Sequence, residues 1–369
     1  MRVYGDNQGY HRGLSVGGRN CMASGLGSAF QITFHGRKAI QEGIMKKLIS
    51  LLALSVHLVF LAFAPLPMSP VADAYAADTE EIVVGYIPIA DCLQIYVAEA
   101  MGYFQQEGIS VQKRAMKGGT AIAPAVESGD IQVGWSNTVS IIIAHTKGFD
   151  FTFLTPGAIE VEGGHRTHAL LVPSNSPIKE IRELAGKVVA INTLGNVNEL
   201  SITALAERYG IDMKTVRLVE IPFPDMEAAL KNNSVDAALV AEPFVTLSVM
   251  HGSAKVLEAS AHKAFGDKFM IASWFAKKSW AEKHPTKAAA FARAIAKASD
   301  YITNNPKEVS GHLLSATKLP ADLVGKITLP AFSPTFDLVD MQNLIDIAAK
   351  HKFIDASFPA REIAYQSPR

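Results

Sequence analysis

The sequence predicts an α/β protein of two lobes, each a mixed, mostly parallel sheet with helices on both faces. Three observations predict this class. Short apolar runs alternate with segments of helical periodicity over residues 82–240, the pattern of parallel strands joined by crossover helices. One order of helix, strand, small-residue turn, helix and strand occurs over 98–133 and again over 202–239. The composition, 49% hydrophobic and 19% charged, suits a chain that builds such cores.

The charge balance and the cysteine count exclude several classes of protein. The 369 residues contain 35 Lys and Arg against 35 Asp and Glu, whereas a nucleic-acid binder needs a basic face that neutralises phosphates. Only two cysteines are present, too few for a disulfide-based scaffold. We therefore expect a folded protein with no nucleic-acid partner.

The first 76 residues are interpreted as lying outside the folded protein. Residues 1–44 are rich in glycine and lack apolar periodicity, which indicates a disordered extension or a misplaced translation start. Residues 45–76 have a basic start, a long apolar run and the small residues Ala74 and Ala76, the three parts of a cleavable signal peptide. An uncleaved membrane anchor is the alternative. Cleavage near Ala76 predicts a free periplasmic protein.

The first lobe begins with an apolar run over 82–87 that predicts a strand covered on both faces. Pro88 ends this strand, and Asp91 is placed to cap a helix over 93–104 that Gly108 terminates. The pattern then predicts a strand over 109–116, a helix over 121–128, a strand over 131–135 and a helix over 138–145.

The second lobe repeats this order. The pattern predicts strands over 188–192, 216–221 and 237–240, with helices over 197–209 and 224–231. Two copies of one unit indicate two similar lobes, and chance similarity between such units is the alternative. Helices over 288–301 and 338–351 come without a matching strand signal, so we expect them to pack against the first lobe.

Motifs of catalysis are absent from the folded part expected over residues 77–369, which contains no G-x-S-x-G elbow, P-loop or H-E-x-x-H. Cys92 lies at a predicted helix start, where a thiolate is favoured, but no histidine lies beside it. His165 and His168 have a spacing that binds metal on a helix, yet Gly163 and Gly164 indicate a loop there. We expect no enzyme activity, no cofactor and no metal; His165 and Arg166 are possible anion contacts in a solvated loop.

Four predicted strands end in a turn of small or hydroxyl residues that opens a helix. Because helix N-termini expose unpaired N–H groups, four of them in one crevice are able to hold an anion without a buried lysine. Routine helix capping is the alternative for each turn alone. The turns are 89–91, 118–120, 136–138 and 193–196.

The chain resembles the sulfonate, taurine and nitrate group of periplasmic substrate-binding proteins of ABC importers, which also includes thiamine-precursor binders. The resemblance covers roughly residues 81–300 and rests on five stretches. They are Gly102-Tyr103-Phe104 through Gly108-Ile109, residues 127–134, residues 184–190, Val235-Asp236-Ala237 leading to Glu242-Pro243-Phe244, and residues 281–285.

The resemblance implies a type II periplasmic-binding-protein fold, in which two crossover strands form the hinge between the lobes. We place the crossovers near 169–172 and 270–275. The first lobe then comprises residues 77–170 plus 271–369, and the second comprises 171–270. Family loops map the ligand contacts to twelve residues: Ile89, Ala90, Asp91, Gly119, Thr120, Ser136, Asn137, Gly195, Asn196, Asn198, Glu242 and Phe244.

Carboxylates near this site affect the expected ligand. Asp91, Glu199 and Glu242 disfavour a plain inorganic anion and suit a ligand that also carries an amine or other donors. Trp135, Phe223 and Phe244 are candidate apolar or stacking surfaces, with core packing as their alternative. A small organic acid, such as a sulfonate, taurine-like compound or carboxylate with a second polar group, is therefore expected.

The resemblance implies a monomeric receptor that delivers its ligand to the permease and ATPase subunits of an ABC importer. One alternative is a thiamine-precursor pyrimidine binder or a related pyrimidine synthase. A second alternative is a ligand-sensing partner of a signalling receptor.

Overall fold

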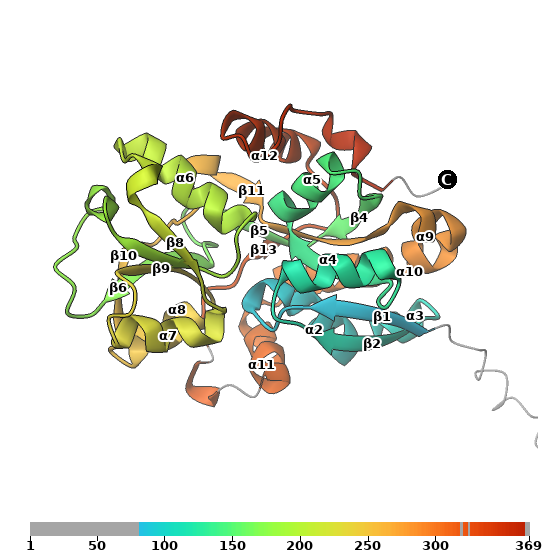
Figure 1. Ribbon diagram of the computed structural model, residues 1–369. Coiled ribbons are helices and arrows are strands. Elements are labelled where there is room, and N and C mark those ends of the chain that lie inside the picture. Colours follow the sequence, from blue (N-terminus) through green and yellow to red (C-terminus); the bar gives the residue numbers. More distant parts are fainter. Residues whose placement is uncertain (1–80, 318–319, 324, 366–369) are drawn as a thin grey trace, which may run out of the picture. The chain divides into compact units, whose positions relative to one another are not determined.

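The computed structural model describes residues 81–317, 320–323 and 325–365, all within one compact unit of the chain (Figure 1). The extension expected over 1–44 and the signal peptide expected over 45–76 lie outside the described residues. In the part of the chain that the structure describes, every helix is too short or too polar to cross a membrane.

The first sheet has five strands in the order β2-β1-β3-β12-β4. β1 pairs in parallel with β2 and β3, whereas β12 runs antiparallel to both β3 and β4. The strands are β1 (Glu81–Tyr86), β2 (Ser110–Ala115), β3 (Val133–Asn137), β4 (Phe151–Pro156) and β12 (Ala272–Lys277). The helices of this lobe are α2 (Leu93–Ala100), α3 (Tyr103–Gln106), α4 (Gly119–Ser128), α5 (Thr138–Thr146), α9 (Lys278–Lys283), α10 (Pro285–Asn304), α11 (Pro306–Thr317) and α12 (Leu338–Lys350).

Helices cover both faces of this sheet because neighbouring residues of a strand point to opposite faces. In β12, Trp274 packs edge-on against Phe291 of α10. Phe275 points the other way, toward Gly134 of β3 and the face that Ile122 of α4 covers. A Cβ at Gly134 would lie 2.6 Å from Ile122 and 2.7 Å from Phe275, so glycine is what allows this helix to approach the sheet closely.

The second sheet repeats the topology of the first, with the order β10-β6-β9-β7-β8. β7 is parallel to β8 and β9, and β6 is antiparallel to β9 and β10. Its strands are β6 (His168–Pro173), β7 (Val188–Ile191), β8 (Arg217–Glu220), β9 (Ala237–Ala241) and β10 (Ala254–Glu258), and its helices are α6 (Val197–Tyr209), α7 (Phe223–Lys231) and α8 (Phe244–Met250). In both sheets one antiparallel strand is inserted between the third and fourth parallel strands. The α/β class, the mixed sheets and the internal repeat are thus confirmed.

A third, small sheet lies along the two chain segments that connect the lobes. β5 (Ala158–Val161) pairs with β11 (Lys268–Met270) and with β13 (Ala331–Phe332). β6 belongs to the second sheet over its whole length, and β12 belongs to the first. The lobe boundaries expected from the sequence stay a prediction.

Of the C-terminal helices, α10 packs on α2, α3 and β4, whereas α12 packs on both α5 and β11 of the small sheet. Two expectations are wrong in detail. β13 lies in the region that shows no strand signal, and the helix predicted over 93–104 is divided into α2 and α3 at Gly102, whose φ is +67°. Asp91 also does not cap α2; it is the middle residue of a 3₁₀ turn and makes no capping hydrogen bond.

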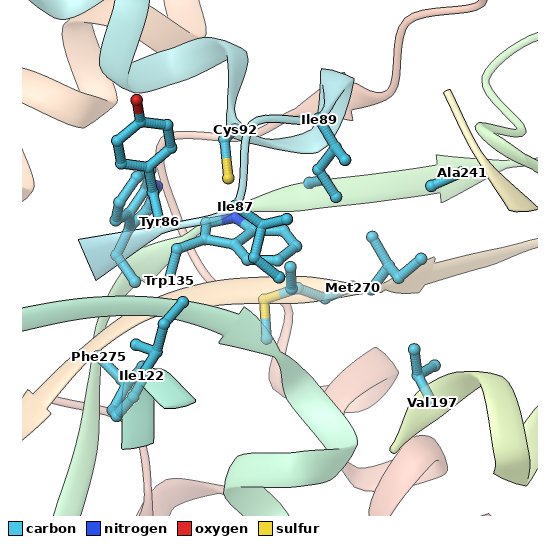
Figure 2. Packing of buried hydrophobic residues seen from close by; sticks show 14 of the residues in the cluster. Tyr86, Ile87, Ile89, Cys92, Ile122, Trp135, Val197, Ala241, Met270 and Phe275 are labelled. Carbon is cyan, nitrogen blue, oxygen red and sulfur yellow. The ribbon is translucent and has the colours of Figure 1, made fainter. Parts of the chain in front are cut away.

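The main hydrophobic core continues from the first lobe into the contact between the lobes. Figure 2 shows Ile87, Ile89 and Trp135 of the first lobe together with Val197 and Ala241 of the second. A separate, smaller core lies within the second lobe. Apolar burial therefore stabilises the closed arrangement of the two lobes as well as each lobe alone.

Candidate functional site

A small cavity lies between the two lobes. Its free volume is about 20 Å³, which is enough for one water molecule. A larger solute therefore needs the lobes to move apart before it enters. The lining residues are Ile87, Ile89, Asp91, Trp135, Asn137, His168, Asn192, Asn196, Val197, Asn198, Phe223 and Ile271.

These residues meet because the two sheets present corresponding edges to the cavity. In the first sheet the chain reaches the cavity just after β1 and at the end of β3, and Asn192 follows β7 in the second sheet. The antiparallel strands begin at the edge where the parallel strands end: His168 pairs with Ala241, and Ala272 pairs with Asn137. This edge, at the carboxyl ends of parallel strands, is where open α/β sheets bind ligands.

Asp91 is fully buried, and its two oxygens have different surroundings. Oδ1 accepts a hydrogen bond of 2.9 Å from the hydroxyl of the buried Thr167, which directly precedes β6 of the second sheet. Oδ2 has no hydrogen-bond partner among the described residues, and it lies 3.9 Å from Nε2 of His168. Burial raises the pKa of Asp91 to about 6, although the charge of His168 opposes that shift.

A network of hydrogen bonds between buried side chains begins at His168 and leads away from the cavity. Oε1 of Glu160 accepts a hydrogen bond of 3.0 Å from Nδ1 of His168, and Oε2 accepts one of 2.9 Å from Nδ1 of His262. Nε2 of His262 lies 3.1 Å from Oδ1 of Asn198, and Asn198 is itself a residue of the cavity wall. The network thus joins the connecting segments to the site.

The charges of this network follow from its contacts. Burial acts to raise the pKa of Glu160, but the His262 charge and the hydrogen bond from His168 hold it well below its ordinary value. Burial acts to lower the pKa of His168, but Asp91 and Glu160 together raise it. Burial lowers the pKa of His262 despite the opposing effect of Glu160. The contacts therefore favour an ionised Glu160 and stabilise the protonated form of His168 beside it.

Two of the four helix N-termini expected to hold an anion, those of α5 and α6, already have acceptors within the protein. Oδ1 of Asn137 accepts hydrogen bonds from Ser140 N in α5 and from Val197 N in α6. Oδ1 of Asn196 accepts from Asn198 N and Glu199 N. These side chains cap the helices and thereby occupy donors that the sequence-based hypothesis assigned to a ligand.

Direct hydrogen bonds between the lobes surround the cavity. Ala90 N donates to Glu242 O at 3.0 Å, and Val197 N donates to Asn137 Oδ1 at 3.2 Å. The hydroxyl of Ser140 donates to Gly195 O at 3.1 Å. The loops after β1 and β3 are therefore joined to the second lobe by backbone atoms as well as by side chains.

The twelve residues predicted for the site fall into two sets. Five line the cavity: Ile89, Asp91, Asn137, Asn196 and Asn198. Of the others, Ala90 and Ser136 are buried, Gly119 and Gly195 line a neighbouring pocket, and the Thr120 side chain lies outside the description. Glu242 is bonded to Thr246 and Thr328 N, and Phe244 lines another pocket.

His165 and Arg166 lie beside the small sheet, where the protein itself supplies their partners. His165 Nδ1 is 3.0 Å from Leu329 O. Arg166 forms ion pairs with Glu162 at 2.9 Å and Glu160 at 3.5 Å. His165 and His168, whose spacing suits a metal on a helix, have different partners here, since Nδ1 of His168 lies 3.0 Å from Oε1 of Glu160.

Sequence reasoning missed several lining residues, above all His168 and Asn192. Asn192 directly follows β7 and obeys the rule used for the other turns. His168 and Ile271 escaped it because they stand at or before the starts of antiparallel strands. A search that included the first residues of the inserted antiparallel strands would have identified both His168 and Ile271.

A wider pocket of about 430 Å³ adjoins the cavity. It shares Ile87, Ile89 and Phe223 with the cavity and is otherwise lined largely by apolar residues, including Met116 and Phe244. These shared side chains therefore stand between the buried cavity and the outer pocket.

Known proteins resemble this chain in sequence and in structure. A family model described as NMT1/THI5 like matches residues 90–309. The taurine-binding periplasmic protein of Escherichia coli is 28% identical over 63% of this chain and 69% of its own length. A 4-amino-5-hydroxymethyl-2-methylpyrimidine phosphate synthase of Uromyces fabae is 22% identical over 58% of this chain and 64% of its own.

Solved structures share the fold. The alkanesulfonate-binding protein of Xanthomonas axonopodis, bound to MOPS, superposes with a TM-score of 0.66 at 15% identity. The alignment covers 77% of this chain and 98% of that protein. At this level of identity the likeness establishes the periplasmic-binding-protein fold, as the sequence predicted.

Proposed function

The chain belongs to the NMT1/THI5-like family, and from this premise we propose that it is the periplasmic solute-binding component of an ABC importer. The observation that carries the proposal is the cavity between the lobes, whose polar walls come from corresponding edges of both sheets. The name of the taurine-binding relative supports the compartment and the type of function.

Capture of the solute follows from the two-lobed design. A solute that binds one lobe of the open form gains further contacts when the second lobe closes, so it favours the closed form. Membrane subunits that recognise the closed form then accept only the loaded receptor. We propose that these partners are a permease and an ATPase. We also propose that this chain is a monomer that delivers the solute to them.

The solute proposed for this site is a small organic compound with more than one polar group. Asn137, Asn192 and Asn198 line the cavity beside Asp91 and His168, whereas Ile87 and Phe223 supply apolar walls. Such a lining suits a compact body with polar groups at defined positions.

A thermal-shift screen of the purified protein tests this function. We expect a solute from a panel of taurine, alkanesulfonates, nitrate, aromatic acids and aminopyrimidines to raise the melting temperature, because a ligand at about 100 times its Kd adds about 2.7 kcal/mol. A flat response to the whole panel, including in calorimetry, would contradict the proposal.

The synthases among the relatives raise the alternative of catalysis. Glu160, His168 and His262 have candidate metal-ligand atoms within 4.8 Å of one another. However, both Nδ1 atoms are already hydrogen-bonded to the Glu160 carboxylate, which favours a structural role. Formation of a pyrimidine product by the purified protein with added Fe²⁺ would favour the enzyme.

A further inference from the structure

Two buried polar atoms of the cavity wall lack partners. Asp91 Oδ2 and Trp135 Nε1 have no hydrogen bond among the described residues, although Asp91 is 0% and Trp135 is 3% exposed. Both residues line the cavity. Since buried polar groups in folded proteins are nearly always hydrogen-bonded, two such atoms on one small cavity indicate groups that a bound molecule completes.

The other buried tryptophan shows what a satisfied indole requires here. Nε1 of Trp274 donates to Oε1 of Gln94 at 2.8 Å, and that amide in turn donates to Pro156 O and to Ser299. No such acceptor faces Trp135 in the described part of the chain. A buried indole of this core can thus have an acceptor within the protein, and the missing acceptor at Trp135 is a feature of the cavity that this residue lines.

We propose, building on the solute-binding function, that the solute is a nitrogen compound whose N–H group binds Asp91 Oδ2 and whose acceptor atom binds Trp135 Nε1. Asp91 Oδ2 only accepts hydrogen bonds when the carboxyl group is ionised, and the indole N–H only donates. The two atoms thus require a solute with both kinds of group. Protonated amines, amides and amino-heterocycles meet that requirement.

The charges around the cavity disfavour a simple anion. Its described lining contains neither lysine nor arginine, and the nearby Arg166 is paired with Glu160 and Glu162. An anion without N–H groups leaves Oδ2 unpaired and places a second negative charge close to it. A solute N–H group gives Oδ2 the donor it lacks, and a protonated amine also brings a positive charge to it, whereas His168, 3.9 Å away, is already bonded to Glu160.

The experiment compares solutes that differ in the N–H group alone. Taurine is paired with ethanesulfonate, and 4-amino-2-methylpyrimidine is paired with 2,4-dimethylpyrimidine; nitrate is the simple anion. Affinities are measured by calorimetry at pH 7.5 for the wild type and for Asp91→Asn, Trp135→Phe and Trp274→Phe. Trp274→Phe is the control because its indole donates to Gln94 and does not line the cavity.

In the wild type we expect at least one N–H compound to bind about tenfold or more tightly than its partner. Trp135→Phe should weaken both members of that pair, Asp91→Asn should reduce the difference between them, and Trp274→Phe should leave the ratio unchanged. Equal or tighter binding of ethanesulfonate, dimethylpyrimidine or nitrate would overturn the inference and leave the proposed function standing. Absence of binding by every compound would overturn both.

Discussion

At the scale of single residues, Asp91 shows best how burial sets the properties of the site. It follows β1 of the first sheet, and the donor it has among the described residues is Thr167, which directly precedes β6 of the second sheet. Burial raises its pKa from 3.8 to about 6. The folded state therefore binds a proton more tightly than the unfolded state does, and the ionised carboxylate costs stability at neutral pH.

We predict that Asp91→Asn gains stability relative to the wild type as the pH rises. Well below the unfolded pKa of 3.8 both folded and unfolded wild-type chains carry the proton, so this contribution is absent. Between pH 4 and 6 the wild type loses stability, and by pH 7 the loss amounts to about 3 kcal/mol, because one pKa unit corresponds to about 1.4 kcal/mol. Urea unfolding of both proteins at pH 4, 5, 6 and 7 measures how the difference in their free energies of unfolding changes with pH. A difference that is constant with pH would contradict the assignment.

Gly157 gives a second prediction at this scale. It links β4 to β5, and a Cβ at this position would lie 2.8 Å from the carbonyl oxygen of Ala272. Because that neighbour is backbone and its carbonyl accepts from Gly157 N at 2.9 Å, Gly157→Ala should cost about 1–3 kcal/mol of unfolding free energy. Gly311→Ala in α11 meets no atom within 4 Å and should add about 0.5–1 kcal/mol. Denaturant midpoints that move equally in both variants would contradict this account.

At the scale of elements, capping side chains connect helix stability to the site. Asn196 caps α6 through two backbone donors and also lines the cavity. Asp337 caps α12 through the corresponding two donors and lies away from the cavity. The two caps thus form a matched pair that separates folding from binding.

We predict that Asn196→Ala and Asp337→Ala each lower the free energy of unfolding by about 1 kcal/mol. Only Asn196→Ala should weaken solute binding as well. Thermal melts give the first effect, and titration of each folded variant with the best solute of the screen gives the second. Loss of binding in Asp337→Ala, or full binding in Asn196→Ala, would refute the role of Asn196 in the cavity wall.

Much of the element order was readable from the sequence. The runs at 82–87 and 237–240 are apolar because both faces of those strands are covered, and this is a strong local signal. β10 was missed because it lies at the edge of the sheet and its burial, with one buried, two exposed and two half-buried residues in order, lacks the alternation that marks a strand. β13 has only two residues, too few for any periodicity. The lining residues His168 and Ile271 were missed because they stand at or before the starts of antiparallel strands. The direction of a strand is decided by tertiary pairing and cannot be read from its own residues.

At the scale of the whole molecule, direct contacts hold the two lobes together and leave little space for a solute between them. The cavity holds about 20 Å³ of free volume, while apolar side chains and backbone hydrogen bonds join its walls across the lobes. Closure of this kind was not readable from the sequence, because it depends on residues far apart in the chain such as Ala90 and Glu242.

Ser140→Ala tests the contribution of one interlobe hydrogen bond. Its hydroxyl donates to Gly195 O in the other lobe, so we expect the variant to favour opening and to bind the solute about three- to tenfold more weakly, in line with about 1 kcal/mol per bond. Thr146→Ala is the control, because its hydroxyl donates within α5 to Ile143 O. Calorimetric Kd values decide, and equal values for both variants would show that the bond does not stabilise closure.

The central claim is that the chain holds one solute in the cavity between its lobes. Calorimetric titration with the compound that gives the largest thermal shift, on the wild type and on the double variant of Asp91→Asn and Trp135→Phe, tests it most directly. We predict one site per chain in the wild type and at least a hundredfold weaker binding in the folded double variant, about 2.7 kcal/mol. Binding of unchanged strength in the double variant would place the solute elsewhere and contradict the account.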